Sequence, residues 1–398
     1  MKKMTSRPQP AGSSEKIAKV VAFMPSLGKG GGIERYCEWL FEALEEGGSR
    51  VARVALLRAG EALSIWRKAR FILEAIRVGR RAKRAGPAIA IVAHPGLGFA
   101  ALVAMRIARF APRDSFVFYY GTDAWSLGRI EQRILRRSRL RPVTISAFSA
   151  GALVSEDNAA VVEPGLQRGW FTTLLEMPRP AESETGPLLN VLSVFRLAEA
   201  HGKGLPTLLE AVRALEPVHS CRLTIAGSGA LPRDLQEEID RRPGVKVISD
   251  PSDTELAALY AQADVVVLAT RTTHSGPLAG EGFGIVLVEA QLVGTPVIGP
   301  AFGGSDAAYL RGVTGLRPAD ESTEALTRVL AKLAGDPLSL HRMGHNAKVW
   351  AMAAFDPDRR SAEAQQLLLG AVESTGPDLL PVRIGETGSK AGSAERDS

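Results

Sequence analysis

Two acidic residues lie eight positions apart in the segment Glu281-Gly-Phe-Gly-Ile-Val-Leu-Val-Glu289. The Gly-Phe-Gly turn opens an apolar stretch, and a helix that begins near Gly284 would present free backbone N–H groups to an anion. Eight residues span about 12 Å in a helix. The spacing therefore predicts a diphosphate between two carboxylates, one taking sugar hydroxyls and the other ribose hydroxyls. Alternatively Glu289 is an exposed helix residue, although its apolar neighbours would make an unpaired acid costly.

Two cations, Arg196 and Lys203, lie seven positions apart after an apolar run that ends at Phe195. Fixed cations at this spacing can bracket a diphosphate and neutralise the charge that develops on it as a glycosidic bond breaks. Taken alone, both would be ordinary surface cations. Their place after a strand-like run, together with the acid pair, favours a binding site.

A glycine-rich loop, Gly28-Lys-Gly30-Gly31-Gly32, precedes a helical pattern from Ile33 to Glu45. Glycines allow backbone N–H groups to approach a phosphate or an acceptor closely. The nicotinamide fingerprint G-x-G-x-x-G fails here because Ile33 stands at its third glycine. A second short loop, Gly227-Ser-Gly229, is expected to form a tight turn near a nucleotide.

Three further polar residues follow strand-like runs: His94, Tyr120 and Asp123. We expect them to contact a sugar or an acceptor. His94 has an equally good alternative as a strand-end histidine that hydrogen-bonds to backbone.

The elements that carry these loops alternate between apolar strand-like runs and helical patterns, which predicts a parallel α/β fold. Ligands bind at the carboxyl ends of the strands in such folds. The strand candidates are Ile17–Met24, Arg50–Leu57, Ala88–Ala93, Ser115–Tyr119, Val143–Ser146, Ala160–Glu163, Leu188–Phe195, Cys221–Ala226, Val245–Ser249, Asp264–Ala269 and Thr295–Gly299. Three helical patterns without a strand follow between Glu321 and Glu373.

The predicted organisation has two sheet-containing domains, because 398 residues with 45% apolar side chains exceed one ordinary domain. The expected parts are a disordered leader 1–15, a first domain 16–170, a linker 171–187, a second domain 188–354, a helix 355–374 that crosses back to the first domain, and a disordered tail 375–398.

Cysteine content and the apolar runs limit the possible compartments. Cys37 and Cys221 are too few for a disulfide framework and lack zinc spacing, which favours a reducing cytosol. The N-terminus has no apolar core of a secretory signal. Residues 85–105 are nearly uncharged, but Pro87 and Pro95 favour a strand, a loop and a helix over a membrane span.

Charge is distributed unevenly along the chain. Residues 1–180 carry 29 Lys and Arg against 15 Asp and Glu, whereas the remainder carries 20 against 28. The basic residues cluster on two helical segments, 67–84 and 129–141, and apolar residues interleave with the first. This pattern is typical of a helix on an anionic membrane surface, with a solvated helix face as the alternative. Nucleic-acid binding is disfavoured because recognition motifs are missing.

The acid pair resembles the E-x7-E motif of the retaining family-four glycosyltransferases, which have the GT-B fold. The similarity continues through Ala290–Ile298, Gly303-Gly304-Ser305 and Gly312–Gly315. Arg196 and Lys203 resemble the family's R-x6-KG signature, and Gly31 to Arg35 its GGxER loop. Many relatives have a donor-contacting histidine where this chain has Tyr120, so that role passes to Tyr120 or Asp123, or the group shapes acceptor choice.

This resemblance implies two Rossmann-like doubly wound parallel-sheet domains that face a cleft. It implies catalytic roles for Arg196, Lys203 and Glu281. The implied donor contacts are Gly31, Gly32, Arg196, Lys203, Gly227, Glu281, Phe283, Gly284, Ile285 and Glu289.

The implied activity is transfer of a hexose, with retention, from a UDP- or GDP-linked sugar to a saccharide or lipid-linked acceptor in envelope or exopolysaccharide synthesis. The stretch around Tyr120 resembles enzymes some of which use GDP-mannose, which favours that donor. No cofactor or metal is expected, because Arg196, Lys203 and the helix start offset the diphosphate, and Asp356-Pro-Asp358 is better explained as a helix cap. The expected location is the cytoplasm, at the inner membrane face. The alternatives are a nucleotide-sugar epimerase or hydrolase of the same fold, and a non-catalytic envelope-assembly partner.

Overall fold

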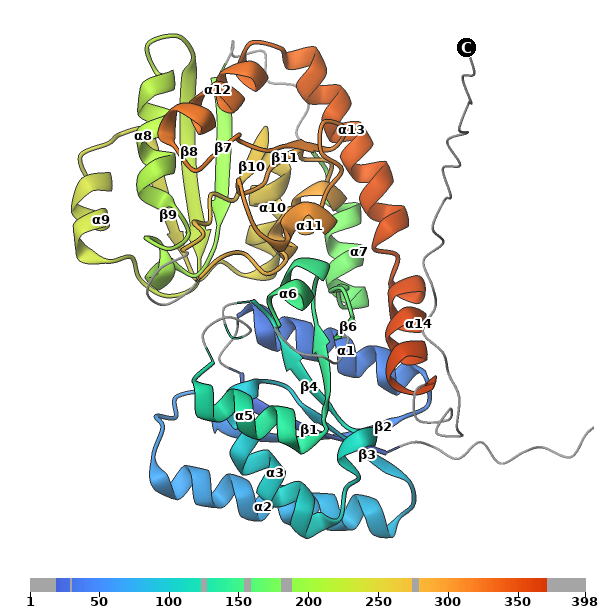
Figure 1. Cartoon of the computed structure of the whole chain (residues 1–398). Coiled ribbons are helices and arrows are strands. Elements are labelled where there is room, and N and C mark those ends of the chain that lie inside the picture. Colours follow the sequence, from blue (N-terminus) through green and yellow to red (C-terminus); the bar gives the residue numbers. More distant parts are fainter. Residues whose placement is uncertain are drawn as a thin grey trace, which may run out of the picture.

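A computed structural model describes residues 19–28, 31–121, 123, 127–153, 159–179, 188–273 and 279–370. Two six-stranded parallel sheets lie one above the other in Figure 1, each covered by helices. This confirms the predicted fold class, two doubly wound α/β domains. The leader 1–15, the tail 375–398, Gly30 and the second half of the predicted linker lie outside the described residues.

The N-terminal sheet has the strand order β2-β1-β3-β4-β5-β6. Its central strands β3 and β4 are buried except at Ala88, which explains their continuous apolar runs. The strands are β1 (Lys19–Leu27), β2 (Arg50–Arg58), β3 (Ala88–Val92), β4 (Phe116–Tyr119), β5 (Arg141–Thr144) and β6 (Ala160–Val161).

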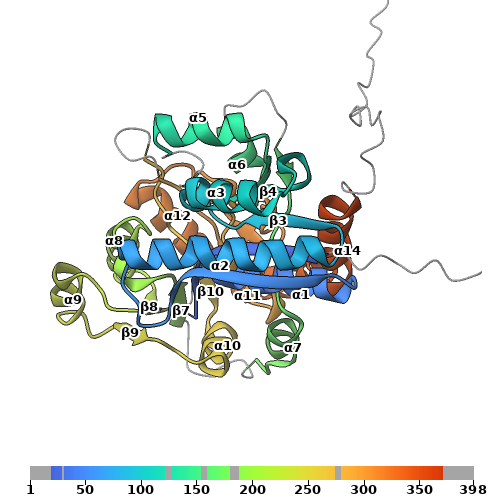
Figure 2. The same ribbon diagram turned by 90° about the horizontal axis from the view of Figure 1, so that it is seen from below.

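Helices cover both faces of this sheet. The outer face carries α2 (Ile65–Arg84), α3 (Gly98–Ala108) and α5 (Arg129–Ser138), whose buried side chains share one core with β1, β3 and β4. Figure 2 shows these three helices side by side. The opposite face packs against α1 (Gly32–Glu46), and α6 (Ala147–Ala152) follows β5.

The C-terminal sheet has the order β12-β11-β10-β7-β8-β9. Its strands are β7 (Leu188–Val194), β8 (Ser220–Gly227), β9 (Val245–Ser249), β10 (Val265–Val267), β11 (Val297–Ile298) and β12 (Gly315–Leu316). Its helices are α8 (Leu205–Leu215), α9 (Arg233–Ile239), α10 (Asp253–Gln262), α11 (Ile285–Leu292), α12 (Thr323–Ala334) and α13 (Pro337–Ala354).

Two helices connect the domains. The helix α14 (Pro357–Leu368) lies beside α1, and the Gln365 side-chain amide donates to the Ala43 carbonyl at 2.7 Å. The helix α7 (Arg168–Glu176) packs against α10 and α11, while Arg168 forms ion pairs with Glu46 and Asp358. Cross-domain packing therefore places the loops of the two sheets in contact.

In the described part of the chain, no helix is long and apolar enough to cross a membrane. Residues 85–105 form the end of a turn, β3, a short 3-10 helix (Pro95–Leu97) and most of α3, as the prolines predicted.

Candidate functional site

Loops that follow the strands of the two sheets approach each other closely at three glycines. Glycines make this approach possible: a Cβ on Gly282 would collide with the Tyr120 carbonyl oxygen, and one on Gly304 would lie 2.6 Å from Ser146 Oγ. A Cβ on Gly31 would likewise collide with the Arg196 guanidinium. The candidate site therefore lies where the two domains touch.

Lys203 and Glu281 form an ion pair in this region. Lys203 Nζ lies 3.1 Å from Glu281 Oε2, with 22% of the lysine and 13% of the glutamate side chain exposed. The Thr270 hydroxyl donates to the same oxygen at 2.9 Å. Burial opposes ionisation of Glu281, yet Lys203, Thr270 and the Phe283 N–H hold its pKa below the usual range. The Glu281 carboxylate in turn raises the pKa of Lys203, so both groups are charged at neutral pH.

Arg196 lies near Lys203, immediately after β7. Its guanidinium pairs with Glu199 at 2.8 Å, is about half exposed, and lies against Gly31 of the opposite domain. Arg196 also opposes the raised pKa of Lys203 electrostatically, as a neighbouring cation does. The two cations thus lie near each other in the C-terminal domain, at its contact with the N-terminal domain.

The helix α11 begins next to Glu281. Gly284, at φ +81°, caps its N-terminus, and the Gly304 N–H donates to the Glu281 carbonyl at 2.7 Å. The Phe283 side chain is buried in the core, where its ring packs on Phe355. Any contact of Phe283 with a ligand would therefore be through its backbone.

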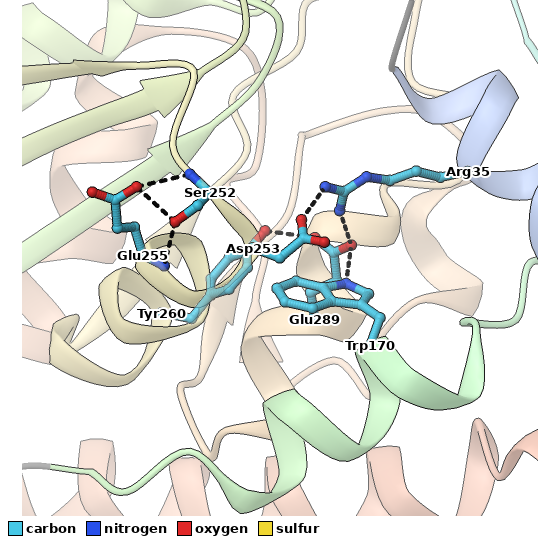
Figure 3. A network of polar contacts seen from close by, with 7 residues as sticks. All are labelled: Arg35, Trp170, Ser252, Asp253, Glu255, Tyr260 and Glu289. Atoms are coloured by element: carbon cyan, nitrogen blue, oxygen red, sulfur yellow. Dashed lines mark hydrogen bonds and ion pairs between the residues drawn. The ribbon is translucent and has the colours of Figure 1, made fainter. Parts of the chain in front are cut away.

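Glu289 is the most enclosed of the charged residues predicted for the site, with 2% of its surface exposed. Its carboxylate accepts hydrogen bonds from the Tyr260 hydroxyl at 2.6 Å and from Trp170 Nε1 at 2.9 Å. Arg35 Nη1 approaches it at 3.4 Å, and Arg35 Nη2 donates to Asp253 at 2.8 Å (Figure 3). Glu289 is therefore the centre of a polar network, not an exposed helix residue.

Sequence reasoning did not select the partners in this network. Arg35 is the last residue of the GGxER loop, and this motif could have pointed to it. Trp170, Asp253 and Tyr260 belong to no motif that the sequence shows. Burial lowers the pKa of Arg35, but the carboxylates of Glu289 and Asp253 raise it overall. Thr270 was also missed; it follows β10, at the edge where polar residues are expected.

Asp123, a candidate contact, also holds the backbone of the loop that precedes it. Its carboxylate accepts the N–H groups of Tyr120 and Gly121, each at 2.8 Å. His94 Nε2 lies 3.9 Å from Asp123, while His94 Nδ1 accepts the Gly96 N–H at 3.0 Å. Burial lowers the pKa of His94 and raises that of Asp123. The backbone-satisfied alternative for His94 thus holds for one ring nitrogen.

Two further predicted site residues, Tyr120 and Gly227, make close contacts within their own domains. The Tyr120 hydroxyl lies 3.4 Å from Cys37 Sγ, and burial raises the tyrosine pKa well above its usual value. A Cβ at Gly227 would collide with the Phe195 carbonyl inside the same domain. Among the described residues, none outside its own helix turn and chain neighbours lies within 4 Å of an ideal Cβ on Gly32.

Across the described ranges, no group of three or more His, Cys, Asp or Glu side chains is arranged to hold a metal ion. Asp356 caps α14 by accepting the Arg359 N–H, as expected from its sequence position.

Comparison with known proteins adds a sequence match over the C-terminal domain. Residues 181–350 match the family described as "Glycosyl transferases group 1". The chain is 31% identical over 216 residues to D-inositol 3-phosphate glycosyltransferase of Corynebacterium glutamicum, covering 52% of this chain and 47% of that protein.

A second curated relative is the GDP-mannose-dependent alpha-(1-6)-phosphatidylinositol monomannoside mannosyltransferase of Mycolicibacterium smegmatis. It is 31% identical over 176 residues, which cover 43% of this chain and 46% of the relative. The chain thus spans about half the length of these curated relatives.

Among solved structures, Anabaena Alr3699/HepE in complex with UDP-glucose superposes with a TM-score of 0.67 at 18% identity, over 88% of this chain and 99% of that one. At this identity the similarity concerns the fold, and it extends across both domains.

Proposed function

We propose that the chain transfers a hexose from a nucleotide-diphosphate sugar to a saccharide or lipid-linked acceptor, because its residues 181–350 match the family of glycosyl transferases group 1. The setting we propose is cell-envelope or exopolysaccharide synthesis. The two curated relatives support this proposal by name, since one is a D-inositol 3-phosphate glycosyltransferase and the other a phosphatidylinositol monomannoside mannosyltransferase.

The observation that carries this proposal is the Lys203–Glu281 pair beside Arg196 and the start of α11. A diphosphate placed here would meet two cations and a helix N-terminus, each of which stabilises negative charge. Charge grows on the diphosphate as the sugar leaves, so these groups stabilise the transition state more than the ground state. Glu281 can accept hydroxyls of the departing sugar, and Glu289 those of the ribose.

We further propose retention of anomeric configuration and no requirement for a metal. In this scheme, the bond from the anomeric carbon to the diphosphate breaks while the acceptor hydroxyl bonds to the same face of that carbon. The acceptor proton passes to a phosphate oxygen of the leaving nucleoside diphosphate. The protein positions the two substrates and stabilises the leaving group.

The donor is a UDP- or GDP-linked sugar in this proposal. One relative is named for GDP-mannose, and one structural neighbour was solved with UDP-glucose.

Incubation with a panel of UDP- and GDP-sugars tests the proposed function. We expect release of nucleoside diphosphate from one donor that depends on an added saccharide or lipid-linked acceptor, with the anomeric configuration of the product retained by proton NMR. Turnover of donor without acceptor would instead identify a hydrolase or epimerase. Failure of every donor to react or bind would favour the non-catalytic alternative.

We also propose that α2 binds an anionic membrane surface. One stripe of this helix is exposed along its length, at alternating spacings of four and three residues, and carries Trp66, Arg70, Leu73, Arg77, Arg80 and Arg84. The opposite stripe, with Phe71, Ala75 and Gly79, is buried against the sheet and the end of α3. Trp66 is 81% and Leu73 69% exposed. Apolar anchors interleaved with arginines fit the interface of an anionic bilayer.

Replacing Trp66 and Leu73 together with serine should release the protein from anionic vesicles. We expect the vesicle-bound fraction to fall about tenfold or more, because burial of one large apolar side chain contributes about 1.5–3 kcal/mol. Co-sedimentation with phosphatidylglycerol vesicles measures this, and binding of the unaltered protein should weaken with added salt. Leu338→Ser is the control, since Leu338 is 83% exposed on α13. Absence of binding by the unaltered protein at every salt concentration would refute the proposal.

A further inference from the structure

The carboxylate of Glu289 lies at a junction of three parts of the chain. Tyr260 on α10 belongs to the C-terminal domain, Trp170 lies on the connecting helix α7, and Arg35 lies on α1 of the N-terminal domain. An ionised carboxylate that is 98% enclosed is costly unless donors and a cation surround it. Tyr260 and Trp170 supply neutral donors, and the positive charge comes from Arg35.

The Arg35 guanidinium crosses the domain interface and contacts three residues on its other side. One nitrogen lies 3.4 Å from Glu289, the other donates to Asp253 at 2.8 Å, and the group stacks 5.5 Å from the centre of the Trp170 ring (Figure 3). Arginine is suited to this role because its planar fork satisfies two acceptors and an aromatic face at once. All three partners lie outside the N-terminal sheet and its helices, so the contact exists only while the domains are together.

We propose that Arg35 is a positioning residue that couples closure of the two domains to the nucleotide end of the site, acting through Glu289 and Asp253. This rests on the proposed function, which places a donor nucleotide next to Glu289. An ionised carboxylate has about four acceptor positions, of which Tyr260, Trp170 and Arg35 occupy three. The position that these described donors leave would take a ribose hydroxyl, in an orientation that the three donors fix.

Separation of the domains would remove the cation from an enclosed carboxylate. The Glu289 carboxylate that would bind the ribose is therefore the same group that attracts Arg35 and stabilises the closed arrangement. Because binding equilibria are linked, nucleotide binding and domain closure must strengthen each other to the same extent. Nucleotide binding should favour closure, and loss of Arg35 should weaken both.

The test compares Arg35→Ala with Arg35→Lys and a matched control, Arg53→Ala. Arg53 also pairs with a carboxylate, Glu45 at 3.2 Å, and lies 5.4 Å from an aromatic centre, Phe41, but both partners are in its own domain. Small-angle X-ray scattering gives the radius of gyration of the ligand-free proteins. Calorimetric titration with UDP and with GDP gives the dissociation constants, and thermal unfolding verifies that each variant is folded.

For Arg35→Ala we expect a larger radius of gyration than for the unaltered protein. We also expect about tenfold weaker binding of the preferred nucleotide, within the usual range of coupling between sites. Arg35→Lys should recover part of both effects, and Arg53→Ala should show neither. An unchanged radius of gyration in Arg35→Ala, or nucleotide binding within twofold of the unaltered protein, would overturn the proposal.

Failure of the proposed function gives a different result. If neither UDP nor GDP binds the unaltered protein, the assignment of a nucleotide to this site is wrong, and the coupling to nucleotide is refuted with it. A protein that binds and transfers normally while Arg35→Ala stays compact would refute the role of Arg35 alone.

Discussion

Replacing Lys203 with methionine should lower kcat/KM for sugar transfer by at least about 100-fold, the usual loss when a group that stabilises developing negative charge is removed. Lys203 lies 3.1 Å from Glu281 and near Arg196, so the variant removes one of the two cations proposed to face the diphosphate. It also leaves the largely buried Glu281 carboxylate without its ion-pair partner, which raises the cost of keeping that acid ionised. Initial-rate measurements with the identified donor give the result.

The control for this variant is Lys348→Met. The Lys348 ammonium is also partly buried and donates to the Leu175 carbonyl at 2.9 Å, but it lies outside the candidate site. Its transfer activity should remain within threefold of the unaltered protein. If folded Lys203→Met also stayed within threefold, the assignment of the diphosphate to this lysine would be wrong. Glu281→Gln offers a second measurement, since it removes the charge of the partner with little change in shape.

Replacing Gly282 with alanine should reduce kcat about 100-fold while leaving the thermal midpoint nearly unchanged. The added Cβ would collide with the Tyr120 carbonyl oxygen of the opposite domain, so the domains could not reach the observed arrangement. Misplacement of reacting groups by about 1 Å is enough for a loss of this size. The core around Phe71 lies within the N-terminal domain and the core around Leu209 within the C-terminal domain, so both would remain and thermal unfolding should detect little.

The matched control for Gly282→Ala is Gly227→Ala. A Cβ at Gly227 would collide with the Phe195 carbonyl within the C-terminal domain. We therefore expect this variant to lose stability, by about 1–3 kcal/mol as for other overpacked positions. A Gly282→Ala protein with full transfer activity would show that the contact with Tyr120 is not needed for turnover.

The sequence was sufficient to predict the fold because each buried parallel strand is a short apolar run followed by a turn. The run Val245–Ser249 was predicted with its observed ends, and Val143–Ser146 begins two residues inside β5 (Arg141–Thr144). The strand β12 was missed because its two residues, Gly315 and Leu316, carry no periodicity. Its pairing with β11 is visible only in the assembled sheet.

The site was predictable in its residue types but not in all of its pairings. Arg196, Lys203 and Glu281 were selected from spacing, and the structure places them close together. The contacts of Glu289 were not predictable, because Arg35 and Trp170 lie 254 and 119 positions away from it in the chain. A local sequence pattern does not determine which side chains meet when two domains pack. The close approach of Gly282 to Tyr120 was unpredictable for the same reason.

Phosphorus NMR of UDP and GDP mixed with the protein tests most directly whether a nucleotide diphosphate lies between Lys203, Arg196 and the start of α11. We predict that the phosphate resonances of one of these nucleotides shift or broaden with the unaltered protein, and that Lys203→Met largely abolishes the change. Phosphate resonances that stay unaffected by the unaltered protein, or that respond equally to Lys203→Met, would contradict this account.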